Sequence, residues 1–134
     1  MVEIELEASI NNLAKATEFV TEQLEGIMCN MGTQMQIELA VDEIFTNICM
    51  YAYEPKTGNA TIQVDVDTPG VVKLTFIDSG VPYNPLEKED PDTTLSASER
   101  KIGGLGIYLV KKSMDDMIYE YKDGHNILTL IKRL

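Results

Sequence analysis

Positive charge is scarce in this sequence of 134 residues. It has 11 Lys and Arg side chains against 22 Asp and Glu, which gives a formal charge of −11 at pH 7. Proteins that bind nucleic acids without reading bases depend on clustered Lys and Arg side chains that neutralise phosphates. The deficit therefore argues against DNA or RNA as a direct partner and favours a partner with a basic surface.

Long apolar runs and cysteines are also few. No stretch approaches the roughly 20 apolar residues that a membrane-spanning helix needs, and the N-terminus, acidic at positions 3, 5 and 7, lacks the layout of a signal peptide. The two cysteines, Cys29 and Cys49, are too few and too far apart for a zinc framework. These absences predict a cytoplasmic protein without membrane contact, with two free thiols packed in helices.

The spacing of apolar residues divides the chain into recognisable segments, and its length predicts one domain over residues 1–134. The expected order is a strand at 2–7, helices at about 13–30 and 33–51, strands at 60–66 and 71–77, a long loop at 81–102, a helix from about 103, and a hairpin at 117–131. We expect Asn30 and Gly32 to end the first helix. This order predicts an α+β fold, a two-layer sandwich with helices on one face of a mixed β-sheet.

Glu43 and Asn47 are the first candidate functional residues. They are four residues apart on the second predicted helix, so their side chains lie on one face. A carboxylate and an amide in this arrangement can supply a general base and a metal ligand to one site. Surface Glu and Asn at this spacing are also common, so the pair alone fits an ordinary solvated face as well.

Asp78 and Gly80 follow the second strand of the predicted hairpin, at the start of the long loop. A carboxylate at a strand end can accept a hydrogen bond from an exocyclic amine, and a glycine two residues later leaves room for a flat ring. A simple turn that ends the strand is the alternative interpretation.

Residues 103–106 (GGLG) open a helix directly after the long loop. Free backbone N–H groups at a helix N-terminus favour an anion, and glycines allow it to approach closely. The segment is neither a Walker loop nor a dinucleotide fingerprint, because the residues that either motif requires are missing. Lys101 is near enough to reach a terminal phosphate. Flexibility at a helix start is the alternative interpretation.

Taken in order, these three segments resemble the motifs of the histidine-kinase-like (GHKL) ATPases. Residues 43–47 (EIFTN) resemble the N box, residues 78–82 (DSGVP) the first glycine box and residues 103–110 (GGLGIYLV) the second. The resemblance is strongest to the stand-alone anti-sigma factor serine/threonine-protein kinases and covers nearly the whole chain. It implies a Bergerat-type ATP-binding fold and a homodimer.

The resemblance also implies roles for individual residues. Asn47 would coordinate Mg²⁺, Glu43 would act as general base on a serine hydroxyl, and Asp78 would hydrogen-bond the adenine amino group of ATP. Lys101 would contact the terminal phosphate, and an ATP lid would span about residues 83–102. The remaining ATP-binding residues that it implies are Gly80, Pro82, Gly103, Gly104, Leu105, Gly106 and Thr129.

The implied function is phosphorylation of a serine on an antagonist protein, together with sequestration of a sigma factor. A non-catalytic module that uses ATP only to shape its protein-binding surface is the alternative, and an ATPase fragment of a sensor histidine kinase is a weaker one. Two sites depart from the family pattern. Met50 and Tyr51 replace a basic residue and a histidine, and His125 and Asn126 stand where Gly and Thr are common. We interpret His125 as an ordinary turn histidine.

Overall fold

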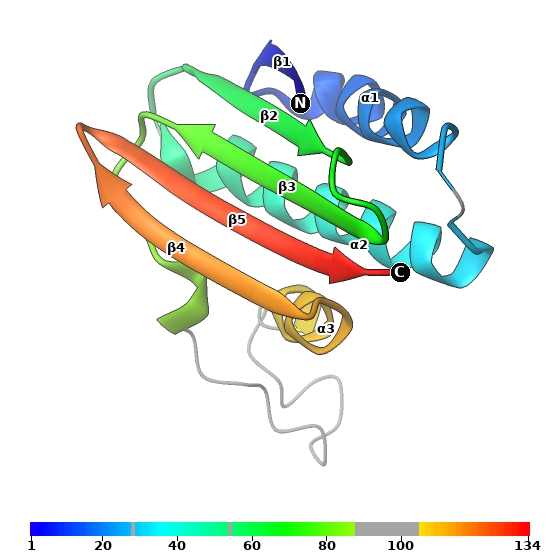
Figure 1. The fold of residues 1–134 in the computed structure, drawn as a ribbon. Coiled ribbons are helices and arrows are strands. Elements are labelled where there is room, and N and C mark those ends of the chain that lie inside the picture. The colour runs from blue at the N-terminus through cyan, green and yellow to red at the C-terminus, as the bar shows by residue number, and fades with distance from the viewer. Residues whose placement is uncertain (28, 54, 88–104) are drawn as a thin grey trace.

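The computed structural model describes residues 1–27, 29–53, 55–87 and 105–134. Its helices lie on one side of a sheet, so the predicted two-layer α+β architecture is confirmed (Figure 1). The elements are β1 (Val2–Glu7), η1 (Ile10–Asn12), α1 (Leu13–Leu24), α2 (Met31–Asn47), η2 (Ile48–Ala52), β2 (Asn59–Asp65), β3 (Val71–Asp78), η3 (Pro85–Glu87), α3 (Leu105–Ser113), β4 (Asp116–Lys122) and β5 (His125–Arg133).

The strand order is β1-β2-β3-β5-β4, and each of these neighbouring pairs is antiparallel. The prediction of a mixed sheet is therefore wrong in this detail. The connection through α3 brings β4 into the same direction as β3, but β5 lies between the two strands and pairs with both. A parallel contact between β3 and β4 is thereby replaced by two antiparallel ones.

One face of the sheet forms the core. Ile62 on β2 lies opposite Phe76 on β3, and Phe76 lies opposite Leu128 on β5. All three side chains are buried, in agreement with the alternating burial along each strand. Several apolar side chains of α2 belong to the same buried cluster, namely Ile37, Ala40, Val41, Ile44 and Phe45.

The hairpin of β4 and β5 turns at Asp123 and Gly124, as the sequence predicts. Both residues have positive φ, 54° and 80° respectively, as a type I′ turn requires. This turn fixes the register, in which Tyr119 lies opposite Leu128. Asn126, two residues before Leu128 on the same face of β5, therefore comes within reach of the Tyr119 side chain.

Asn30 begins a helix instead of ending one. α1 stops at Leu24, and the Asn30 side chain accepts a hydrogen bond from the backbone N–H of Thr33 at 2.7 Å, which caps α2. The expectation that Asn30 and Gly32 end the first helix is therefore wrong. Asparagine suits both ends of a helix, so its presence alone does not decide between them.

Two further observations bear on the predictions. Across the described ranges, no helix is both long and apolar enough to cross a membrane. Cys29 and Cys49 are free thiols, as predicted, and burial raises the pKa of both. Cys49 lies in η2, whereas Cys29 lies between α1 and α2 and outside any helix.

Candidate functional site

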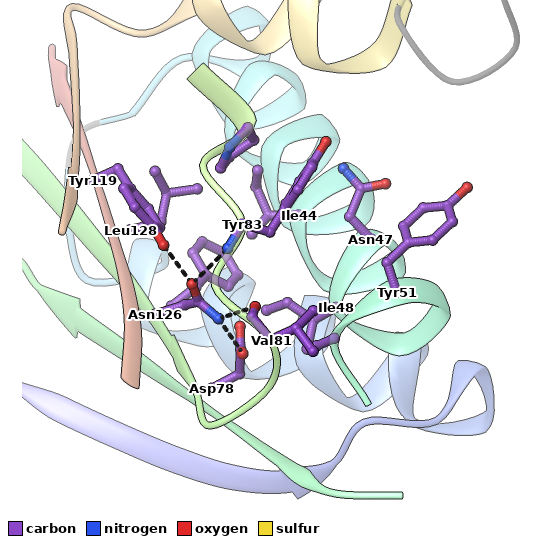
Figure 2. Close-up of a pocket in the computed structure, with 13 residues that line it drawn as sticks. Ile44, Asn47, Ile48, Tyr51, Asp78, Val81, Tyr83, Tyr119, Asn126 and Leu128 are labelled. Carbon is purple, nitrogen blue, oxygen red and sulfur yellow. Dashed lines mark hydrogen bonds between the residues drawn. The ribbon is translucent and has the colours of Figure 1, made fainter. Parts of the chain in front are cut away.

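A cavity opens between the C-terminal end of α2, the C-terminal end of β3 and the N-terminal end of β5 (Figure 2). Its volume is about 50 Å³, and the empty space is about 480 Å³ when adjoining open solvent is included. Sites for small molecules measure roughly 300–1,000 Å³, so a ligand here would extend beyond the cavity itself. The lining residues are Ile44, Asn47, Ile48, Tyr51, Ala52, Phe76, Asp78, Val81, Tyr83, Pro85, Tyr119, Asn126 and Leu128.

Asp78 brings a carboxylate into this cavity from the last position of β3. It follows Leu74 and Phe76 on the core face of the strand, so it is only 7% exposed. Its Oδ1 accepts hydrogen bonds from the backbone N–H of Gly80 and from Nδ2 of Asn126, both at 2.9 Å. Among the described residues Oδ2 receives no hydrogen bond, which leaves it available to a donor in the cavity.

Asn126 is a buried residue of the cavity wall that sequence reasoning did not place there. It is 6% exposed and lies directly opposite Asp78 in the pairing of β3 with β5. Figure 2 shows its amide between Asp78, Val81, Tyr83 and Tyr119. The alternation of side chains along β5 could have indicated its position, because it places Asn126 on the same face as Leu128 and Leu130.

Thr129 lies on the other face of β5, so the prediction that it lines the adenine pocket is wrong. Its hydroxyl is 3.5 Å from the hydroxyl of Thr75, its partner on β3. Successive side chains of a strand point to opposite faces, and Leu128 occupies the cavity side at this point of β5.

Gly80 permits a close approach of two backbone segments. A Cβ added to Gly80 would overlap the backbone carbonyl of Ala52, and the N–H of Val81 donates to that same carbonyl at 3.0 Å. Protein therefore occupies the space that the sequence interpretation left for a ligand ring. Pro82 is exposed and is not among the lining residues, whereas its neighbours Val81 and Tyr83 are.

Glu43 lies against the first turn of α3. A Cβ added to Gly106 would overlap the Glu43 carboxylate, so the glycine is what allows the two helices to meet here. Burial raises the pKa of Glu43, and the negative charge of Asp42 adds to this effect. Asn47, one turn further along α2, lines the cavity. The structure therefore brings Glu43 to the start of α3 and Asn47 to the cavity.

The second-glycine segment is described only from its third residue. α3 begins at Leu105, close to the predicted start. Lys101, Gly103 and Gly104 lie outside the described residues, as does most of the predicted lid at 83–102. Two residues from the described start of the predicted lid, Tyr83 and Pro85, line the cavity.

Tyr51 reaches the cavity from η2, a π-helical turn that directly follows Asn47. Such wide turns are rare and occur frequently at functional sites. The Tyr51 side chain is 53% exposed at the mouth, so the departure from the family pattern at this position changes the cavity wall. Met50 is exposed and is not among the lining residues.

Comparisons with known proteins identify the family. The family described as "Histidine kinase-like ATPase domain" matches residues 6–132. The chain therefore belongs to the histidine kinase-like ATPase family, which confirms the resemblance drawn from the three motifs. Membership in an ATPase family implies that the domain binds ATP.

Individual relatives agree with this assignment. The chain is 31% identical over 94 residues to "Serine/threonine-protein kinase BtrW" of Bordetella bronchiseptica, an alignment that covers 70% of this chain and 66% of BtrW. In fold it is similar to a structure of the RsbU and RsbW domains of a Mycobacterium tuberculosis protein, with a TM-score of 0.64 and 16% identity over all of this chain and 33% of that one. The mycobacterial sensor histidine kinase MprB gives a TM-score of 0.57 and 14% identity, over 99% of this chain and 100% of that one. The chain thus spans just under two thirds of BtrW and a third of the Mycobacterium tuberculosis chain.

Substitution of Gly80 tests the close approach to Ala52. Gly80→Ala forces a methyl group against the Ala52 carbonyl, so we expect a loss of about 1–3 kcal/mol in the free energy of unfolding. Gly26→Ala is the matched control, because a Cβ there meets no atom within 4 Å. Chemical denaturation of both variants measures the difference, and equal stabilities would contradict this account of Gly80.

Glu43 should lower the stability of the protein at neutral and alkaline pH. Because its folded-state pKa is raised, the folded state holds this proton more tightly than the unfolded state, and the associated stability is lost as pH rises through the folded-state pKa. We therefore expect Glu43→Gln to raise the melting temperature at pH 8 and to lose this advantage towards pH 4. The control Glu22→Gln removes the same charge from an exposed position of α1. An equal effect in both variants would show only relief of the net charge.

Proposed function

We propose that this chain is an ATP-dependent serine protein kinase that phosphorylates an antagonist protein and sequesters a sigma factor. The observation that carries the proposal is that Asp78 and Asn47, which belong to two distant motifs, line one cavity. Gly106 of the third motif lies against Glu43, one turn before Asn47 on α2. Family membership and the similarity to BtrW, a serine/threonine-protein kinase by name, support the same conclusion.

Base recognition would depend on Asp78. Its carboxylate can only accept hydrogen bonds when ionised, so it selects a ring that presents an N–H donor. The exocyclic 6-amino group of adenine satisfies this condition, whereas the carbonyl that hypoxanthine and guanine carry at the same position would place a second acceptor against Asp78. Apolar side chains on both sides, including Ile48, Phe76 and Leu128, suit a flat aromatic ring.

The phosphates would lie between Asn47 and the first turn of α3. Free backbone N–H groups at a helix start favour anions, and the glycine at 106 lets Glu43 come close to this point. The donor set fits Mg²⁺, which binds through one or two protein oxygens, phosphate oxygens and water. Asn47 would supply the protein oxygen, and when bound the ion would neutralise charge on the phosphates. In the proposal, Lys101, Gly103 and Gly104 contribute from the neighbouring segment.

Glu43 would act as the general base. The oxygen of the acceptor serine bonds to the γ-phosphorus, its proton passes to the Glu43 carboxylate, and the bond from the γ-phosphorus to the bridging oxygen breaks to release ADP. A carboxylate whose pKa is raised by burial is better matched to proton transfer near neutral pH than a fully solvated one.

The proposal extends to the architecture and partners that the resemblance implies. It treats residues 1–134 as one cytoplasmic, homodimeric domain with an ATP lid at about 83–102. The formal charge of −11 suits a protein that binds a basic surface of a sigma factor. A non-catalytic ATP module is the second candidate, because Tyr51 lines the cavity at a position where the family often has a histidine.

Glu43→Gln separates these two functions. Phosphorylation of the cognate antagonist, followed by mass spectrometry of its phosphoserine, should fall by at least about 100-fold, the usual contribution of a general base. ATP affinity, measured by calorimetry, should change little. Glu22→Gln is the matched control, since Glu22 is an exposed carboxylate on α1 that does not line the cavity. Undiminished phosphorylation by Glu43→Gln would remove the catalytic assignment, and ATP-dependent partner binding by a wild type that transfers no phosphate would favour the non-catalytic module.

A further inference from the structure

The side-chain amide of Asn126 has its full hydrogen-bonding capacity in use. Nδ2 donates to Oδ1 of Asp78 and to the backbone carbonyl of Val81, both at 2.9 Å. Oδ1 accepts from the backbone N–H of Tyr83 at 3.1 Å and from the hydroxyl of Tyr119 at 2.5 Å. A side-chain amide has two N–H donors and two lone pairs, so no capacity remains for a ligand.

The orientation of this amide follows from its backbone partners. The N–H of Tyr83 can only donate and the carbonyl of Val81 can only accept, so the oxygen must face the former and the nitrogen the latter. Asp78 therefore receives an N–H group and not a second oxygen. A flipped amide would place two acceptors against each other at Asp78 and two donors against each other at Tyr83.

Asn126 connects three parts of the cavity wall. It joins the carboxylate at the end of β3, the backbone of Val81 and Tyr83 at the mouth, and the phenol of Tyr119 on β4 (Figure 2). With Asn126 and the N–H of Gly80 both bonded to Oδ1, rotation of the Asp78 carboxylate is restricted. Oδ2 is then held as the oxygen that a ligand meets.

We propose that Asn126 is a positioning residue for base recognition, which acts through Asp78 without touching the nucleotide. This inference rests on the proposed ATP site. It assigns to Asn126 the selectivity for a ring with an exocyclic amine over a ring with a carbonyl at the same position. A threonine, common at this point in the family pattern, has one donor and a shorter side chain, so it cannot hold Asp78 and Val81 at once.

Calorimetric titration with ATP and with inosine triphosphate tests this role, because the second nucleotide carries a carbonyl in place of the amine. The wild type should bind ATP at least about tenfold more tightly, as a hydrogen bond to a charged group would give. In Asn126→Ala the ratio of the two affinities should fall to within about threefold. A merely structural loss would weaken both nucleotides together and leave the ratio unchanged.

A double-mutant cycle shows whether Asn126 acts through Asp78. In an Asp78→Ala background, adding Asn126→Ala should leave the affinity ratio where Asp78→Ala alone puts it. Thr129→Ala is the matched control, on the same strand but the opposite face, and should retain the wild-type ratio. If Asn126→Ala fails to fold, Tyr119→Phe removes one of the donors to Asn126 at nearly constant volume and should lower the ratio by itself.

The outcomes separate this inference from the proposed function. A wild type that binds neither nucleotide, or both equally, overturns the ATP site and this inference with it. A wild type that prefers ATP, with the full ratio retained in Asn126→Ala, or in Tyr119→Phe where only that variant folds, overturns the role of Asn126 alone. A further loss of ratio in the double variant beyond Asp78→Ala would show direct contact with the base and would also overturn it.

Discussion

The hydrogen bond between Asn126 and Asp78 is the interaction on which the cavity depends. A carboxylate with 7% exposure loses most of its hydration, a cost of several kcal/mol unless hydrogen bonds replace the lost water. Here one hydrogen bond comes from the backbone N–H of Gly80 in the adjacent turn, and the other comes from Asn126 on β5. The second is possible only because β5 lies next to β3 in the sheet. The order of the strands is therefore what allows a hydrogen-bonded acceptor to lie in the cavity.

Two close approaches complete the site, and both require glycine. The backbone at Gly80 lies against the carbonyl of Ala52, which ties the loop after β3 to the end of η2. Gly106 lies against the Glu43 carboxylate, which ties α3 to α2. The sequence interpretation reserved both glycines for a ligand. In the structure their missing side chains make room for other parts of the protein, and the two segments joined at Gly80, η2 and the loop after β3, line the cavity.

Local patterns predicted what depends on local physics. The five strands, the turn at Asp123 and Gly124, and the position of Asp78 at a strand end followed from alternation and turn residues. The face of β5 that meets the helices did not, because both faces of this strand carry apolar residues. The family resemblance implied Thr129 for the adenine pocket, although Thr129 lies on the other face, and Asn126 was interpreted only as a departure from a motif. Its role needs the pairing of Asp78 with Asn126, a contact between residues 48 apart in the sequence.

The two acidic residues of the site are in different physical states, and this difference fits different roles. Asp78 is fixed by two hydrogen bonds, as a directional acceptor should be. Glu43 is partly desolvated, and its pKa is raised, as a proton acceptor near neutral pH should be. Neither charge attracts phosphate, so in the proposed function the anion must be held by the helix start and by Mg²⁺ at Asn47. The rest of the net charge of −11 acts weakly on that site, because screening at physiological salt limits its reach to about 8 Å. It acts instead at the surface, where a basic partner would meet it.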